Sequence, residues 1–271
     1  MRWTQGRNVR IEQRWAGGSV DAMKALAKEL VALEPDVIVV LSTPATAAVM
    51  QETHTIPIIF VQNFDPVDSG LVKSLVTPEG NVTGFTSYEP AMGSKWLELL
   101  KGIAPQVARV AIIYNPQTAP YAGALRSIEA AAPTFAVQTI AMPIQDAGTI
   151  EKAIEAFARE INPSLMVLPD VTTTVHRKLI VKLAGQHRLP AIYPWRHFVT
   201  DGGLMTYAVN LPALWRRAAS YVDQVLRGEK PVNLPVQQPT KFELVINLTA
   251  AQALGLTIPA SILSLADDLI D

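Results

Sequence analysis

Short apolar runs alternate with amphipathic stretches along most of the chain. The runs at 37–41 and 57–61 are rich in β-branched residues, which is typical of strands covered on both faces of a parallel sheet. The stretches at 19–33 and 91–103 repeat apolar residues at helical spacing. Strands and helices in alternation need crossover connections, so this pattern predicts an α/β fold with parallel sheets.

The alternation stops and starts again near residue 91, which predicts two doubly wound lobes. The expected strands are 8–15, 37–41, 57–61, 81–87, 109–114, 137–142, 165–168, 191–193, 203–207 and 242–248. The expected helices are 19–33, 44–52, 67–75, 91–103, 121–132, 149–160, 174–187, 212–227, 249–254 and 261–270. We assign 1–87 with 211–238 to the first lobe and 88–210 with 239–271 to the second. Three chain crossings between the lobes predict a hinge.

Composition narrows the possible functions. The chain has 271 residues, enough for two lobes of ordinary size, and a net charge of -1, which argues against a broad nucleic-acid face. It contains no cysteine, so disulfides, thiolate metal sites and thiol catalysis are excluded. No apolar run approaches the roughly 18 residues of a membrane span. The four histidines do not cluster and no nucleophile motif occurs, which weakens an interpretation as an enzyme, and we expect no metal or cofactor.

Polar residues follow the expected strands of the first lobe. Ser42 and Thr43 come directly after 37–41 and precede Pro44, so either can cap a helix that begins there. Their hydroxyls and the free N–H groups of the helix suit a carboxylate or a phosphate. A plain helix cap is the alternative. Asn63 and Asp65 follow the next strand and can line the same edge, although Asp65 equally fits a helix start.

Two strand ends of the second lobe, and the start of the helix after the first of them, carry similar candidates. The amide of Asn115 can donate to and accept from a zwitterionic solute, or it can form a strand-to-helix turn. Tyr121 can stack on a ring, or it is an ordinary core or surface tyrosine. Asp170, followed by Thr172, ends a strand that has no other charge. Its carboxylate can pair with a ligand ammonium, cap the following helix, or do both.

Aromatic residues and one arginine lie near other strand ends and crossings. Tyr193 or Trp195 can cover an aromatic ligand. Arg196 can bind a carboxylate bidentately or form a structural bridge between the lobes. Tyr207 can close the floor of a pocket. Tyr88 lies at the first crossing between the lobes, where its ring can touch both.

Several segments resemble one known family over nearly the whole length of the chain. They are GRNVRIEQRWA at 6–16, IPI at 56–58, DPV at 65–67, GNVTG at 80–84, PTKFELVINL at 239–248 and ALGLTIP at 253–259. Their order and spacing resemble ABC-transporter substrate-binding proteins of the tryptophan/tyrosine-binding type. The resemblance implies a type I periplasmic-binding-protein fold that closes on a small solute and docks on a membrane permease.

The resemblance also implies a periplasmic location and no catalytic activity, and we expect a monomer. Family members begin with an export signal, a strand and a helix that are absent before residue 6, so we expect a truncated start and a first lobe without its first strand and helix. The solute is expected to be small and zwitterionic or carboxylated, with an aromatic amino acid as one candidate. A cytosolic ligand sensor and an enzyme on the same fold are the alternatives.

Overall fold

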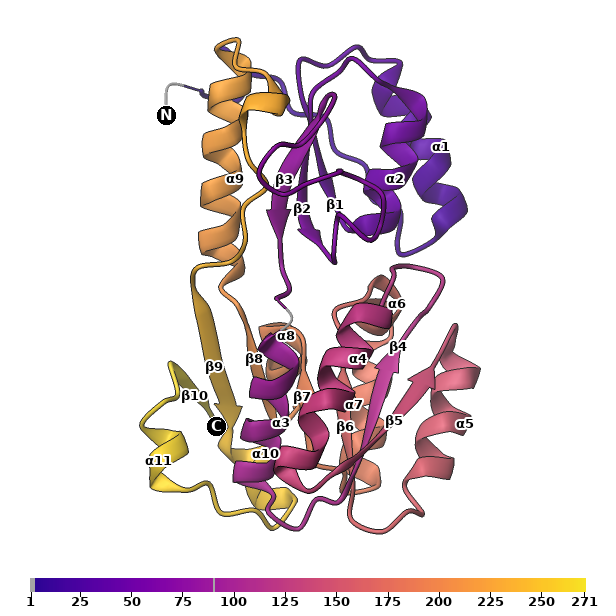
Figure 1. Cartoon of the computed structure of the whole chain (residues 1–271), viewed down its shortest axis with the longest axis vertical. Helices are drawn as coiled ribbons and strands as arrows, with labels where there is room; N and C mark the ends of the chain where they lie inside the picture. Colours follow the sequence, from indigo (N-terminus) through magenta and orange to yellow (C-terminus); the bar gives the residue numbers. More distant parts are fainter. Residues whose placement is uncertain (1–2, 90) are drawn as a thin grey trace. The chain divides into compact units, whose positions relative to one another are not determined.

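The chain builds two separate β-sheets, one in each of two units (Figure 1). The computed structural model describes residues 3–89 and 91–271. Unit 1 comprises Met1–Ser87 with Leu211–Gln238, and unit 2 comprises Tyr88–Asn210 with Pro239–Asp271. The polypeptide therefore passes from one unit to the other three times. The helices and parallel strands of both units confirm the predicted α/β class.

Unit 1 contains a three-stranded parallel sheet in the order β1-β2-β3. Its strands are β1 (Ile38–Leu41), β2 (Ile58–Asn63) and β3 (Val82–Thr86). Its helices are α1 (Val20–Val31), α2 (Thr43–Glu52), α9 (Leu211–Leu226) and the 3-10 turn η2 (Pro231–Asn233). Helix α9 packs on β2 and β3, and Figure 1 shows it on the opposite side of the sheet from α1 and α2. The unbroken apolar run in β2 is buried because helices cover both faces.

Two predicted elements of unit 1 are wrong. Residues 8–15 form no strand, and within the described residues this segment makes only an isolated bridge between Gln5 and Val9. Its alternating pattern selects the faces of a strand but supplies no neighbouring backbone to pair with. Residues 67–75 form turns instead of a helix. Gly70 adopts φ +69° there, and Leu71 and Val72 both donate to the carbonyl of Pro66.

Unit 2 contains a seven-stranded sheet in the order β10-β9-β8-β7-β6-β4-β5. The strands are β4 (Arg109–Tyr114), β5 (Gln138–Pro143), β6 (Pro163–Val167), β7 (Ala191–Tyr193), β8 (Met205–Val209), β9 (Phe242–Asn247) and β10 (Asp268–Ile270). Strands β4 to β8 are mutually parallel, whereas β9 runs antiparallel to β8. The carboxyl ends of β4 and β6 therefore lie side by side at one edge of the sheet.

Helices cover the sheet of unit 2. They are α3 (Ala91–Ile103), α4 (Ala122–Ala131), η1 (Ala132–Phe135), α5 (Ala147–Phe157), α6 (Val171–Val175), α7 (Arg177–Gln186), α8 (Arg196–Thr200), α10 (Leu248–Ala253) and α11 (Ala260–Leu263). Helix α3 buries Trp96, whose indole N–H donates to the carbonyl of Tyr207 at 2.7 Å. Gly93 lets α3 approach α4 closely, because a Cβ there would lie 2.4 Å from Ile128. No helix in the described residues is long and apolar enough to cross a bilayer.

The predicted helix 261–270 is also wrong. It is replaced by the single turn of α11 and by strand β10. The backbone N–H of Asp267 donates to the carbonyl of Leu244 at 2.8 Å, and the carboxylate of Asp267 accepts from the N–H of Leu244 at 2.9 Å. These two contacts attach the end of the chain to β9, and this pairing outweighs local helix propensity.

Candidate functional site

A buried carboxylate lies at the carboxyl end of β6. Asp170 is 7% exposed and caps α6, because its side chain accepts from the N–H groups of Thr172 at 2.6 Å and Thr173 at 3.2 Å. The hydroxyl of Tyr121 lies 2.8 Å from the other carboxylate oxygen, and the hydroxyl of Thr118 also contacts that oxygen. Two backbone N–H groups and two hydroxyl groups therefore contact the carboxylate of Asp170.

The loop after β4 joins the same cluster. The amide of Asn115 donates to the hydroxyl of Thr172 at 2.9 Å and accepts from the N–H of Gln117 at 2.9 Å. The structure thus brings together Asn115, Tyr121, Asp170 and Thr172, four of the residues selected from the sequence. We call this group, together with Thr118, the Asp170 cluster. Sequence reasoning missed Thr118, although its position two residues after an Asn-Pro turn is a weak signal.

The charge of Asp170 has no basic partner. No lysine, arginine or histidine forms an ion pair with this carboxylate in the part of the chain that the structure describes. Burial, with the charge of Asp170 as a second cause, raises the pKa of Tyr121 well above its usual range, so its phenol stays protonated. A buried anion that has only neutral donors around it is suited to pairing with a cationic group.

Unit 1 presents a second set of polar groups at the ends of its strands. In the sheet register, Leu41 lies opposite Val61 and Asn63 lies opposite Thr86, so the three strands end at nearly the same level. The register shifts at Gln62, where β2 bulges. Bulges of this kind re-aim side chains and are common next to functional sites.

Backbone strain is concentrated at the same edge. Ser42 has φ +81°, Gln62 has φ +59° and Asp65 has φ +36°. Left-handed conformations are costly for residues with a Cβ atom, typically about 1–3 kcal/mol each, and they cluster at ligand-binding sites. Three such residues at two adjacent strand ends therefore support a functional role for this edge.

Most side chains at this edge are held by internal hydrogen bonds. Thr43 accepts from the N–H of Phe64 at 3.2 Å. The amide of Asn63 donates at 3.1 Å to the hydroxyl of Thr46, which in turn donates to the carbonyl of Ser42 at 2.8 Å. Ser42 is the N-cap residue of α2, but its side chain makes no capping hydrogen bond. The expected side-chain cap is therefore not formed by this hydroxyl.

Asp65 and four residues of unit 2 have other contacts. The carboxylate of Asp65 accepts from the N–H of Asp68 at 3.1 Å and closes a turn. Each of the others is engaged within unit 2: Tyr88 packs near Trp96, Tyr193 stacks on Phe198, Arg196 pairs with Asp268, and Tyr207 stacks on Phe242. Burial raises the pKa of Tyr193.

Two residues of unit 1 were missed by sequence reasoning. Thr86 is the last residue of β3 and Ser87 follows it. They are 3% and 1% exposed, and their side-chain hydroxyls have no hydrogen-bond partner in the described structure. Their place at the end of an expected strand was the available signal. The sequence could not show that their hydroxyls are unpaired.

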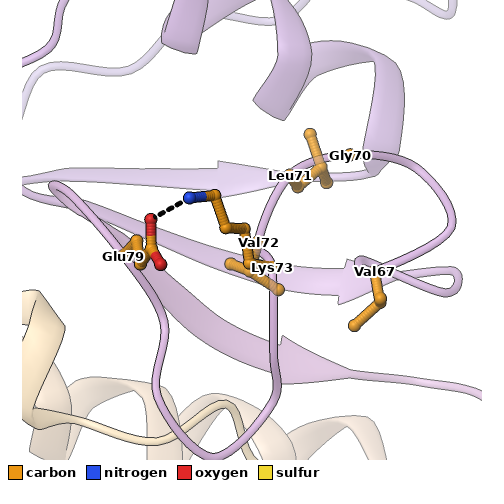
Figure 2. Close-up of a pocket in the computed structure, with 6 residues that line it drawn as sticks. All are labelled: Val67, Gly70, Leu71, Val72, Lys73 and Glu79. Atoms are coloured by element: carbon orange, nitrogen blue, oxygen red, sulfur yellow. Dashed lines mark ion pairs between the residues drawn. The ribbon is translucent and has the colours of Figure 1, made fainter.

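A surface hollow of about 410 Å³ lies elsewhere on unit 1, in the loop between β2 and β3 (Figure 2). It is lined by Val67, Gly70, Leu71, Val72, Lys73 and Glu79. The ammonium of Lys73 lies 2.6 Å from the carboxylate of Glu79, and both side chains are largely exposed. None of the predicted site residues lines this hollow. The strand ends are therefore the better candidate site, because they combine buried polar groups with backbone strain.

Among the described residues, no group of three or more histidine or acidic side chains is placed to hold a metal ion.

Solute-binding proteins have this architecture of two α/β units, each with polar groups at the ends of its parallel strands. Comparison with known proteins identifies the family. The profile described as "ABC transporter substrate binding protein" matches residues 3–270, and the chain belongs to this family. The resemblance seen in the sequence is thereby confirmed.

Three relatives illustrate the similarity. The "Tyrosine-binding protein" of Clostridioides difficile (strain R20291) is 27% identical over 254 residues, which cover 94% of this chain and 73% of that protein. A crystal structure of a conserved domain protein from Vibrio cholerae has a TM-score of 0.92 and 29% identity, covering 98% of this chain and 89% of that one. An ABC domain from Streptococcus pneumonia in complex with L-Trp has a TM-score of 0.87 and 26% identity, covering 93% and 87%.

These comparisons confirm the predicted fold class and function. The protein is an ABC transporter substrate-binding protein with the fold of periplasmic binding proteins. Membership of this family implies a small-molecule ligand and an ABC permease as partner. Such proteins typically act outside the cytoplasm.

Proposed function

We propose that this protein binds an aromatic α-amino acid, delivers it to an ABC permease as a monomer, and works in the periplasm. The observation that carries the proposal is the Asp170 cluster, a buried carboxylate surrounded by neutral donors. Two relatives support the aromatic class, because one is named a tyrosine-binding protein and another was crystallised with L-Trp.

In this proposal Asp170 binds the ammonium group of the solute. Its two backbone donors and the hydroxyl of Tyr121 orient the carboxylate. Asn115 and Thr172 are joined by a hydrogen bond beside it, so the amide and the hydroxyl can complete the polar contacts of the ammonium. The contact would be charge-assisted, which makes it stronger than a hydrogen bond between neutral groups.

Unit 1 binds the carboxylate of the solute in this proposal. Ser42 offers its hydroxyl, and Thr43 and the first turn of α2 offer backbone N–H groups. Asn63 is fully buried and supports this turn through Thr46.

The remaining predicted residues have weaker support. Tyr88, Tyr193 and Tyr207 are proposed to contact the aromatic ring of the solute. Arg196 already pairs with Asp268, and the carboxylate of Asp65 already closes a turn. A role in binding for these two would require them to exchange those contacts for the solute.

Isothermal titration calorimetry on the purified chain tests the proposal. We expect L-tryptophan or L-tyrosine to bind, and we expect tryptamine and N-acetyl-L-tryptophan to bind at least tenfold more weakly because each lacks one charge. Glucose serves as the negative control. If no aromatic amino acid binds while another solute of the panel does, the proposed class is wrong. Light scattering during size-exclusion chromatography tests the monomer.

A further inference from the structure

Thr86 and Ser87 are two adjacent buried residues whose hydroxyls have no hydrogen-bond partner in the described structure. Their backbones are well bonded: Thr86 N–H donates to Gln237 at 2.9 Å, and Ser87 N–H donates to the carbonyl of Asn63 at 3.2 Å. Leaving a buried hydroxyl without a partner is costly. Two neighbours with the same defect point to a partner that is not part of the protein.

Two other buried threonines of unit 1 have hydroxyls that are hydrogen-bonded, so the lack of a partner is confined to Thr86 and Ser87 among these residues. Thr83, on the same strand, donates to the carbonyl of Leu234 at 2.5 Å, and Thr46 donates to the carbonyl of Ser42 at 2.8 Å. Thr83 is fully buried, as Thr86 nearly is. The strand therefore satisfies its threonine hydroxyl in the interior of unit 1 and leaves hydroxyls unpaired only at its carboxyl end.

That end coincides with the strained edge of the sheet. Thr86 lies opposite Asn63 in the register, immediately after the bulge at Gln62, and Ser42 ends the first strand of the same three-stranded sheet. Neighbouring strands are about 4.8 Å apart, so the end of β3 lies beside the end of β2, and Ser42 lies one strand further away at the end of β1. Hydroxyl groups can donate to an anionic acceptor, and the carboxylate of Asp65 at the same edge already accepts from the N–H of Asp68.

We propose that Thr86 and Ser87 donate hydrogen bonds to the carboxylate of the bound amino acid. This inference rests on the proposed function and adds two binding residues to it. The carboxylate is then recognised by neutral hydroxyl donors and not by an arginine or lysine. The unpaired hydroxyls lower the stability of the empty protein and are satisfied when the solute binds.

The experiment compares Thr86→Val and Ser87→Ala with the wild type. Thr83→Val is the matched control, because it removes a hydroxyl that has an internal partner. Binding of L-tryptophan and of L-tryptophanamide, which lacks the carboxylate, is measured by calorimetry. The unfolding midpoint in urea is measured without ligand.

We expect Thr86→Val and Ser87→Ala each to weaken L-tryptophan binding about tenfold to a hundredfold, with little change for L-tryptophanamide. Without ligand, their urea midpoints should equal or exceed that of the wild type, because an unpaired buried group has been removed. Thr83→Val should lower the midpoint, because the carbonyl of Leu234 loses its donor, and should leave the preference for L-tryptophan over its amide unchanged.

Two binding results would overturn the inference while leaving the proposed function intact. One is unchanged L-tryptophan binding by both variants, and the other is an equal loss of affinity for L-tryptophan and its amide. A drop in urea midpoint as large as that of Thr83→Val would also overturn it, since the hydroxyls would then have a structural partner. If the wild type binds no aromatic amino acid, the proposed function fails and the inference fails with it.

Discussion

Replacing Asp170 by asparagine removes the negative charge of the Asp170 cluster with almost no change of shape. The amide oxygen can keep the cap of α6 by accepting from Thr172 and Thr173. The amide nitrogen then faces the hydroxyls of Tyr121 and Thr118, which can accept as well as donate. We therefore expect the free energy of unfolding to change by less than about 1 kcal/mol, since aspartate and asparagine are equivalent caps.

The effect on binding should be much larger. A hydrogen bond to a charged group contributes about 1.5–3 kcal/mol. The charge of Asp170 is already shared among several donors, so we take about 2 kcal/mol, which corresponds to a roughly 30-fold weaker binding of L-tryptophan. Calorimetry should show this loss for L-tryptophan and none for indole-3-propionate, which has a carboxylate but no ammonium group.

Asp146→Asn is the matched control for this prediction. Asp146 also caps a helix of unit 2 and accepts from the N–H of Thr149 at 2.8 Å, but it is exposed and has no part in the Asp170 cluster. This variant should bind L-tryptophan as the wild type does. The reasoning is refuted if Asp170→Asn binds L-tryptophan normally, or if it loses indole-3-propionate to the same degree, because the change would then act on structure and not on charge.

Three further predictions concern stability, all measured by urea unfolding. Gly185→Ala should stabilise unit 2 by about 0.5–1 kcal/mol, because the glycine is exposed in α7, has open space around it and costs backbone entropy; an unchanged midpoint would contradict this. Gly84→Ala should destabilise unit 1 by about 3 kcal/mol or more, because the new Cβ would lie 2.1 Å from the carbonyl oxygen of Phe60; a midpoint equal to the wild type would mean that the strands separate freely. Burial, followed by the charge of Arg177, holds the pKa of His197 below its usual 6.5. The folded state therefore keeps His197 neutral, and the stability from this residue is present above pH 6.5 and is lost as the pH falls below it. His197→Phe should keep the aromatic stack on Phe198 and lose less stability between pH 7 and pH 5 than the wild type does, whereas equal losses would assign the acid sensitivity to other groups.

Local patterns in the chain were enough to predict most helices and strands and four of the five residues of the Asp170 cluster. A short apolar run rich in β-branched residues, such as the one in β2, favours a strand covered on both faces, and this preference can be recognised from the sequence alone. Asp170, Asn115 and Thr172 were found because each follows such a run, and parallel strands bring their carboxyl ends to one edge. The local sequence of strand, cap and helix was therefore sufficient to predict these members of the Asp170 cluster.

Tertiary structure decided everything that depends on a distant partner. Residues 8–15 have the alternation of a strand but find no backbone to pair with among the described residues, whereas Asp268–Ile270 becomes a strand because β9 is available beside it. Whether a buried hydroxyl is satisfied, as in Thr83, or unpaired, as in Thr86, depends on which carbonyl the fold brings near it. Pairing and hydrogen-bond satisfaction join residues far apart in the chain, so no local pattern encodes them.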